Sequence, residues 1–127
     1  AGIMAPAAAA GCGHDSVLLE KNEKLGKKLF LTGKGRCNIT NSCDTDDFFA
    51  NIPRNPKFLY SALYGFSNTD IVELINANGV PTKVERGKRV FPASDKSSDV
   101  IKALTRHLNN SGAELRGIRH TKGRQRL

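Results

Sequence analysis

The chain has 127 residues, 39% of them hydrophobic and 25% charged, and its formal net charge at pH 7 is +8. This length suffices for one domain with its own core, and no run of about 18 apolar residues predicts a membrane-spanning helix. The three cysteines show no C-x-x-C spacing, which argues against a zinc site or a disulfide scaffold. We therefore expect a cytoplasmic protein with reduced thiols, no metal and no membrane partner.

The first part of the chain alternates between helical, extended and turn-like patterns. An alanine-rich stretch stops at Gly11 and Gly13, and a short apolar run leads into Glu20. The order is therefore helix, tight turn, strand and acidic residue. The expected elements are a helix at 3–10, a strand at 16–19, a charged turn at 21–28 and an apolar segment at 29–31 that fits a strand or a last helical turn.

The second part of the chain carries clearer helical signals. Ser67 is followed three residues later by Asp70, which is the pattern of a capping box. Alternating residues around Gly87 favour a hairpin. The expected elements are a loop at 44–55, a short helix at 57–64, a helix at 67–79 with Ile71, Leu74 and Ile75 on one face, a hairpin at 80–92, and a helix at 94–112 with Val100, Ile101, Leu104 and Leu108 inward.

Residues 32–41 read TGKGRCNITN and combine glycines, cations and amides. Gly33 and Gly35 permit positive φ or the close approach of another molecule, and Lys34 and Arg36 add positive charge, so the stretch suits an anionic ligand. It is not a phosphate loop of the G-x-x-x-x-G-K-[ST] kind, because the glycine spacing is too long and Lys34 is followed by glycine. From these residues alone, a solvated surface turn is an equally good interpretation.

Glu20 has a place that is typical of one kind of nucleotide site. In a dinucleotide-binding βαβ unit, a G-x-G-x-x-G turn precedes a helix, and an acid about 20 residues later, at the end of the next strand, binds ribose hydroxyls. Glu20 fits this acid if Gly2 is the third glycine, and the first strand would then precede Ala1. An acid at a strand end is common, so the pattern alone leaves the site open.

Two stretches together resemble one known family. SVLLEKNEKLGKKLFLTGKGRCNITN and KRVFPASDKSSDVIKAL are similar, in order and spacing, to the bacterial FAD-dependent oxidoreductases that include the bile-acid-reductase-like (BaiN-like) flavoproteins. The resemblance implies the N-terminal part of a longer α/β protein: a partial Rossmann-like FAD-binding domain without its first strand, then a mostly helical segment with a β-hairpin. The expected divisions are 1–43 for the FAD-binding part, 44–115 for the start of an inserted region and 116–127 for a disordered basic tail.

The same resemblance implies that TGKGRCNITN wraps FAD, with its backbone close to the pyrophosphate and the flavin. Glu20 would bind the adenosine ribose, and Lys21 would lie near the adenine. A redox role for Cys37 is conceivable, but a small thiol in a packed loop is more often structural. No catalytic acid or base can be named. The implied cofactor-binding residues are Gly2, Glu20, Lys21, Lys28, Gly33, Gly35, Arg36, Cys37, Asn38, Thr40 and Asn41.

The implied parent enzyme takes hydride from NAD(P)H and passes it through FAD to an electron-poor C=C bond of a small molecule. We expect the chain as given to bind FAD poorly and to be inactive by itself, because the strand that precedes the phosphate-binding turn is missing. The net charge supports an alternative of another class, a nucleic-acid-binding module. A flavoenzyme that acts on an RNA base combines the two. The cations that favour RNA are Lys83, Arg86, Lys88 and Arg89 and those of the basic tail.

Two features depart from the family pattern. Pro6 lies in the predicted first helix, where it costs about 3 kcal/mol or kinks the helix unless it occupies the first turn. The tail after Arg116 does not resemble the continuing strand that the family has at this point. These departures predict a loosened first helix and a frayed C-terminal segment.

Overall fold

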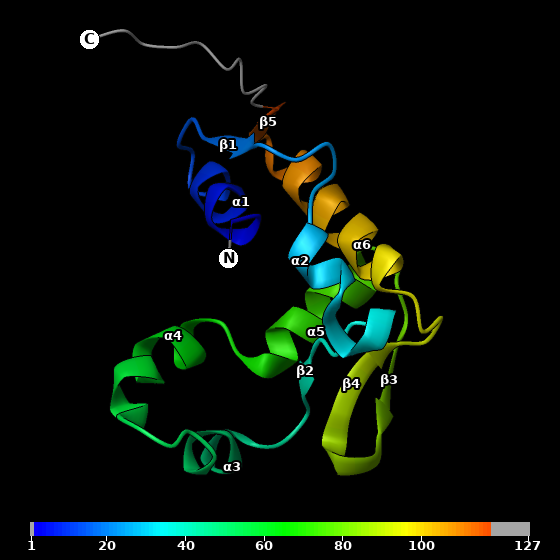
Figure 1. The fold of residues 1–127 in the computed structure, drawn as a ribbon. Coiled ribbons are helices and arrows are strands. Elements are labelled where there is room, and N and C mark those ends of the chain that lie inside the picture. The colour runs from blue at the N-terminus through cyan, green and yellow to red at the C-terminus, as the bar shows by residue number, and fades with distance from the viewer. Residues whose placement is uncertain (1, 118–127) are drawn as a thin grey trace, which may run out of the picture.

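The computed structural model describes residues 2–117 of the chain. Two small sheets lie at opposite ends of this part, and the long helix α6 runs from one toward the other (Figure 1). The helices are α1 (Met4–Gly11), α2 (Lys27–Phe30), α3 (Thr45–Ala50), α4 (Tyr60–Gly65), α5 (Asn68–Ala77) and α6 (Ser97–Ser111), the strands are β1 (Val17–Glu20), β2 (Thr40–Asn41), β3 (Thr82–Glu85), β4 (Arg89–Pro92) and β5 (Glu114–Gly117), and 3-10 turns span Thr32–Gly35, Pro56–Leu59 and Arg86–Lys88.

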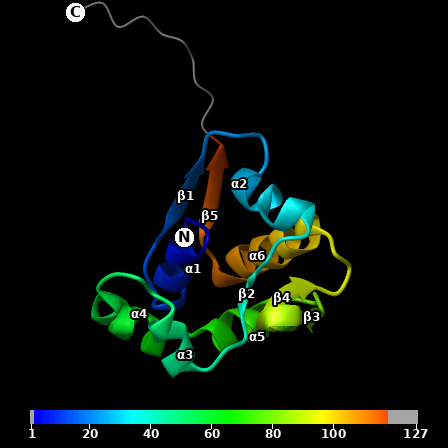
Figure 2. The ribbon, with the colours of Figure 1, turned by 60° about the horizontal axis from the view of Figure 1, so that its bottom comes forward.

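The first sheet pairs β1 with β5 in parallel. Val17 lies opposite Glu114, and Glu20 lies opposite Gly117 at the other end of the pair. Figure 2 shows the two strands side by side, with α1 and α6 next to them. Parallel strands need a crossover between them, and here it includes every element from α2 to α6. The predicted α/β class and the strand that ends at Glu20 are confirmed.

The second sheet is antiparallel and has the order β2-β4-β3. The predicted hairpin forms from β3 and β4, with Lys83 opposite Phe91. Strand β2, which comes from the end of TGKGRCNITN, adds to the same sheet through Thr40 opposite Val90. The sheet thus crosses the predicted boundary at residue 43, and that division of the chain stays a prediction.

Helix α1 accommodates Pro6 without a break. The helix begins at Met4, so Pro6 lies in its first turn, where a backbone N–H has no helical acceptor in any case. The Pro6 carbonyl accepts a hydrogen bond of 2.8 Å from Ser16 Oγ. Farther along α1, Ala7 is buried in a small cluster with Leu108 of α6. Pro6 therefore has the first-turn position that carries no penalty.

The two strongest helical predictions are confirmed. Ser67 caps α5 with a complete capping box, in which its hydroxyl accepts from Asp70 N–H and the Asp70 carboxylate accepts from Ser67 N–H. Helix α6 is capped at its C-terminus by Gly112, whose φ of 86° is readily adopted only by glycine. The inward face of α6 consists of Val100, Ala103, Leu104 and Leu108, while Ile101 is only half buried.

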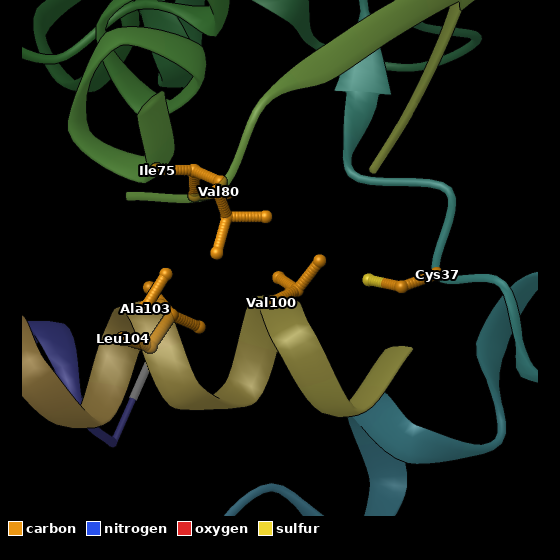
Figure 3. Close-up of a cluster of buried hydrophobic side chains, with 6 residues drawn as sticks. All are labelled: Cys37, Ile75, Val80, Val100, Ala103 and Leu104. Atoms are coloured by element: carbon orange, nitrogen blue, oxygen red, sulfur yellow. The ribbon is translucent and has the colours of Figure 1, made fainter. Parts of the chain in front are cut away.

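The main core lies where α5, α6 and the TGKGRCNITN segment meet (Figure 3). Ile75 and Val80 lie over α6 near Ala103 and Leu104, and Cys37 lies farther along the same face, next to Val100. Cys37 is completely buried. Burial of these apolar groups stabilises the fold and, in the same contacts, attaches the glycine-rich segment to α6. The cluster consists of Cys37, Ile75, Val80, Val100, Ala103 and Leu104.

Two predictions about secondary structure are wrong. Residues 44–55 contain helix α3 instead of a continuous loop, because Asp44 accepts a hydrogen bond from Asp47 N–H and two further acids lie in the first turn. Arg116 also belongs to a strand, β5, so the predicted disordered tail begins too early. The remainder of that tail, 118–127, lies outside the described residues.

Within residues 2–117, no helix is both long and apolar enough to span a bilayer. In the same range, no three His, Cys, Asp or Glu side chains gather in a way that could hold a metal ion.

Candidate functional site

The site predicted from the sequence falls in two places, and the first is the carboxyl end of β1. Glu20 is the last residue of this strand and is half buried. Its Oε1 accepts hydrogen bonds of 2.8 Å from both the backbone N–H and the side-chain amide of Asn22. These bonds, chiefly the one from the Asn22 backbone, lower the pKa of Glu20 below its ordinary value. Glu20 therefore offers an ionised, oriented carboxylate at the edge of a parallel sheet.

A cleft of about 1040 Å³ lies between the segment that follows β1, helix α6 and β5. Its lining is mostly apolar and includes several lysines. Lys21, predicted to lie near an adenine, is one of these lining residues, whereas Lys28 lies exposed on α2 and does not line the cleft. The apolar lining residues are Leu25, Phe30, Leu31, Ile101 and Leu115, and the lysines are Lys21, Lys24, Lys27 and Lys102.

The second place is the TGKGRCNITN loop, whose backbone makes repeated left-handed turns. Gly33, Lys34, Gly35 and Cys37 all have positive φ, between 56° and 85°. A Cβ at Gly33 would lie 2.8 Å from the backbone nitrogen of Asn38, whereas a Cβ at Gly35 would meet nothing within 4 Å. The two glycines therefore have different roles. Gly33 permits the close packing of the loop against its own backbone, and Gly35 adopts a positive φ at a position with no neighbouring atoms.

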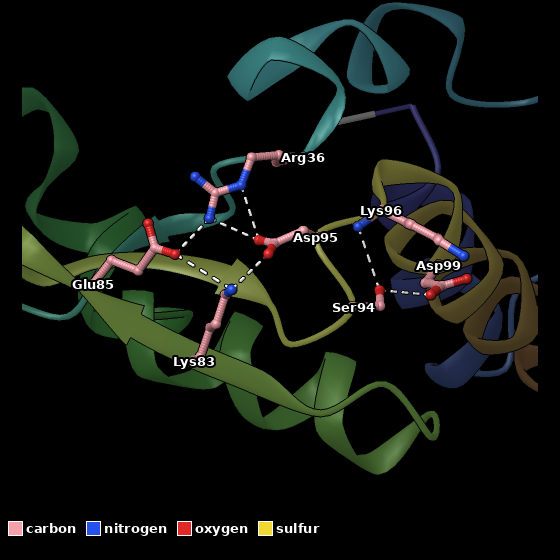
Figure 4. A network of polar contacts seen from close by, with 7 residues as sticks. All are labelled: Arg36, Lys83, Glu85, Ser94, Asp95, Lys96 and Asp99. Carbon is pink, nitrogen blue, oxygen red and sulfur yellow. Dashed lines mark hydrogen bonds and ion pairs between the residues drawn. The ribbon is translucent and has the colours of Figure 1, made fainter.

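Arg36 projects from this loop and forms a group of four charged side chains with Lys83, Glu85 and Asp95, drawn in Figure 4. Its Nε and Nη2 lie 2.9 and 2.7 Å from Asp95 Oδ1, and its Nη2 also pairs with Glu85. Lys83 Nζ reaches both acids, at 2.7 Å from Asp95 and 3.3 Å from Glu85. The face of the guanidinium lies 4.1 Å from the ring centre of Phe91. Below, Arg36, Lys83, Glu85 and Asp95 are called the ion cluster.

The asparagines of the loop attach it to the hairpin. The side-chain amide nitrogen of Asn38 faces two backbone carbonyls and donates to Thr40 O at 3.0 Å and to Val90 O at 3.3 Å. Asn41 Nδ2 donates to Gly87 O at 2.8 Å, and Asn41 Oδ1 accepts from Cys43 N–H. These side chains are thus satisfied within the protein, and the loop is held in one conformation.

Cys37 points from the loop into the main core, and burial raises the pKa of its thiol. A neutral thiol away from solvent is the environment of a structural cysteine. Gly2 lies next to β1, where a Cβ would make an ordinary contact of 4.0 Å with Leu18. The structure therefore brings 33–41 together on the hairpin, whereas Glu20 and Lys21 lie at the carboxyl end of β1 and Gly2 lies near Leu18 of that strand.

Sequence reasoning missed several residues that shape this site. Glu85 and Asp95 are far from Arg36 in the chain, and no local motif pairs them. The sequence predicts that Lys83 favours a nucleic acid, but the ammonium group of Lys83 pairs with Glu85 and Asp95. Gly26 is also missed: it caps α2 with a φ of 74°, and a Cβ there would lie 2.9 Å from Ile101. Of these residues, only Lys83 stands out in the sequence, through its positive charge.

Comparison with known proteins gives a consistent result. The family model described as HI0933-like protein Rossmann domain matches residues 1–125. The 3-dehydro-bile acid delta(4,6)-reductase of Clostridium scindens is 33% identical over 116 residues, which cover 90% of this chain and 28% of that protein. The ribosomal RNA dihydrouridine synthase of Escherichia coli is 35% identical over 80 residues, 63% of this chain and 20% of that protein. Its counterpart in Haemophilus influenzae is 25% identical over 115 residues, 91% of this chain and 28% of that protein.

The chain thus spans less than a third of the length of each of these relatives. The family match, in contrast, covers nearly the whole chain, and the parallel pair β1–β5 with helices beside it agrees with the Rossmann domain that its description names. The resemblance found in the sequence is confirmed: the chain belongs to the HI0933-like Rossmann domain family.

Proposed function

We propose that this chain is part of an FAD-dependent oxidoreductase that takes hydride from NAD(P)H and delivers it to an electron-poor C=C bond. The family match and a reductase relative support this proposal. The observation that carries it is the position of Glu20: an ionised carboxylate at the carboxyl end of a parallel strand that follows helix α1. In Rossmann-like sheets this is the place where an acid accepts hydrogen bonds from a ribose.

The residues present fit FAD on structural grounds. Asn22 donates to Oε1 of Glu20, and the carboxylate, whose two oxygens together offer about four acceptor sites, can still accept from a ribose hydroxyl. The open side of Gly35 lets a large ligand approach the backbone of the loop, since a side chain there would otherwise stand in the way. When bound, FAD would supply the redox chemistry, and the protein would orient it and exclude water.

The substrate is proposed in two forms. A small molecule with a conjugated C=C bond follows the reductase relative. A uracil base in RNA is the second candidate, because two relatives are named ribosomal RNA dihydrouridine synthases and the chain is strongly basic. Exposed lysines that suit RNA phosphates lie between the end of β1 and the TGKGRCNITN loop, and one lies in the loop itself, whereas Lys83 is engaged in the ion cluster. These lysines are Lys21, Lys24, Lys27, Lys28 and Lys34.

The first experiment tests the cofactor. In the full-length protein, purified wild type should be yellow with a flavin spectrum, and Glu20→Ala should retain much less FAD while keeping its helical circular dichroism. Asn22→Ala is the matched control, because it removes the amide bond to Glu20 but keeps the carboxylate. A colourless wild type, or equal FAD retention in Glu20→Ala, would contradict the proposal. A colourless protein that binds RNA would indicate the nucleic-acid-binding module instead.

The second experiment separates the substrates. RNA binding by the full-length flavoprotein should weaken steeply with added salt if lysines contact phosphates. Replacing Lys24 and Lys27 by glutamine should then reduce the slope of log affinity against log salt by about 2. If the protein reduces small conjugated substrates and has no affinity for RNA, the small-molecule substrate is favoured.

We place the enzyme in the cytoplasm, since Cys12, Cys37 and Cys43 are free thiols.

A further inference from the structure

We propose that Arg36 is a positioning residue, which holds the TGKGRCNITN loop through Asp95 and Glu85 and does not neutralise the phosphates of the cofactor. This inference rests on the proposed function, because the loop has to hold FAD for its position to matter. It reassigns the one arginine of the loop and gives a role to two acids that no motif identifies.

The contacts engage three of the five N–H groups of the Arg36 guanidinium within the protein. Both Nε and Nη2 donate to Asp95, Nη2 also pairs with Glu85, and one face of the guanidinium is covered by Phe91. With Lys83, the ion cluster contains two cations and two carboxylates, and its net charge is zero. A neutral cluster attracts a pyrophosphate weakly, whereas a free guanidinium would attract it strongly.

The position of Arg36 in the chain explains why the loop needs this anchor. Arg36 lies between Gly35 and Cys37, within a run of left-handed residues that includes the non-glycines Lys34 and Cys37. Such conformations persist only where the surrounding structure over-determines them. The cluster ties the loop to two other segments at once, because Arg36 comes from the loop, Glu85 from the end of β3, and Asp95 from the turn before α6 (Figure 4).

The two roles of Arg36 predict opposite effects of removing an acid. If Arg36 bound the phosphates directly, neutralising Asp95 would release positive charge and tighten FAD binding. If Arg36 positions the loop, the same change removes a tether and weakens FAD binding. Asp95→Asn is a gentle substitution, because asparagine has the same shape and tolerates the φ of 57° at this position. The sign of the change in affinity therefore distinguishes the roles.

The experiment titrates FAD into the apo form of the full-length protein and follows flavin fluorescence. Asp95→Asn should raise the dissociation constant about tenfold, and Glu85→Gln should raise it about threefold, as expected for loss of charge-assisted hydrogen bonds. Asp99→Asn is the matched control, with the same change in charge four residues later. Asp99 contacts Ser94 and Lys102 and lies outside the ion cluster, so its variant should stay within about twofold of wild type.

Two further measurements separate positioning from general loss of stability. The double variant Arg36→Ala/Asp95→Asn should bind FAD no more weakly than Arg36→Ala alone, since both changes release the same tether. At saturating FAD, the visible band of the bound flavin should shift in Asp95→Asn but not in Asp99→Asn. If Asp95→Asn fails to fold, Glu85→Gln gives the same sign test. Unchanged or tighter binding in the cluster variants overturns this inference alone, whereas a wild type that binds no FAD overturns the proposed function and this inference with it.

Discussion

Gly33 and Gly35 occupy the same loop with similar φ but different surroundings. The Cβ position of Gly33 is blocked by the backbone of Asn38 at 2.8 Å, and that of Gly35 is open. A backbone atom cannot swing aside as a flexible side chain can. Within the chain itself, the first glycine is therefore needed for the internal packing of the loop, and the second for its backbone conformation.

We expect Gly33→Ala to lower the free energy of unfolding of this chain by about 3 kcal/mol, because strain adds to a steric clash. Gly35→Ala should cost only about 1 kcal/mol, the penalty of a left-handed alanine. Gly65→Ala is the control, since Gly65 lies in helix α4 with open space around it. Urea denaturation of the three variants measures the order. An equal loss at both loop positions would show that the close contact at Gly33 is unimportant.

Among elements, α5 is joined to the loop by one buried amide. Asn68, the first residue of α5, donates from Nδ2 to Asn41 O at 2.7 Å and to Cys43 O at 2.8 Å. Asn68→Asp should destabilise the chain by about 2 kcal/mol at pH 7, because a carboxylate cannot donate and would face two carbonyls. Thermal unfolding checks this expectation. The exposed Asn55→Asp should have little effect, and an equal effect at both positions would contradict it.

The capping box of α5 gives a second prediction at the same scale. Ser67→Ala removes the acceptor for Asp70 N–H and should cost about 1 kcal/mol of unfolding free energy. Thr69→Ala, in the exposed first turn of the same helix, is the matched control and should be nearly neutral. Helical circular dichroism followed through urea denaturation measures both. A larger loss for Thr69→Ala would mean that the cap does not stabilise α5.

These elements also show what the sequence predicts and why the rest is hidden. Helices α5 and α6 are predictable because caps and apolar spacing are local signals. Helix α3 is too short to show a period, so its signs in the sequence are the cap at Asp44 and the acids of its first turn. The loop could be singled out by composition, but its attachment to Glu85 and Asp95 depends on contacts between segments about 50 residues apart, which no local pattern encodes.

At the scale of the whole molecule, the ion cluster makes stability depend on pH. Hydrogen bonds from Arg36 lower the pKa of Glu85, and those from Lys83 and then Arg36 lower the pKa of Asp95. Groups with a lowered folded-state pKa stabilise the fold above their unfolded pKa of about 4, and this stabilisation is lost as pH falls below it. Unfolding free energy should therefore drop between pH 5 and pH 3 by less in Asp95→Asn than in wild type. An identical drop in both proteins would show that Asp95 does not cause the loss of stability at low pH. Added salt should reduce the difference between the two proteins, because the cluster is partly exposed.

The parallel pairing of β1 with β5 has a consequence for the route by which the chain folds. Val17 meets Glu114 only after almost the whole described chain has been ordered, so the loss of entropy on closing this long loop precedes any gain from the pair. The hairpin β3–β4 and helices α5 and α6 involve near neighbours and can form early. Amides of β1 and β5 should then acquire protection from hydrogen exchange last during refolding. The candidate ribose-binding carboxylate at the end of β1 would thus be assembled in the slowest step, after the glycine-rich loop is already in place.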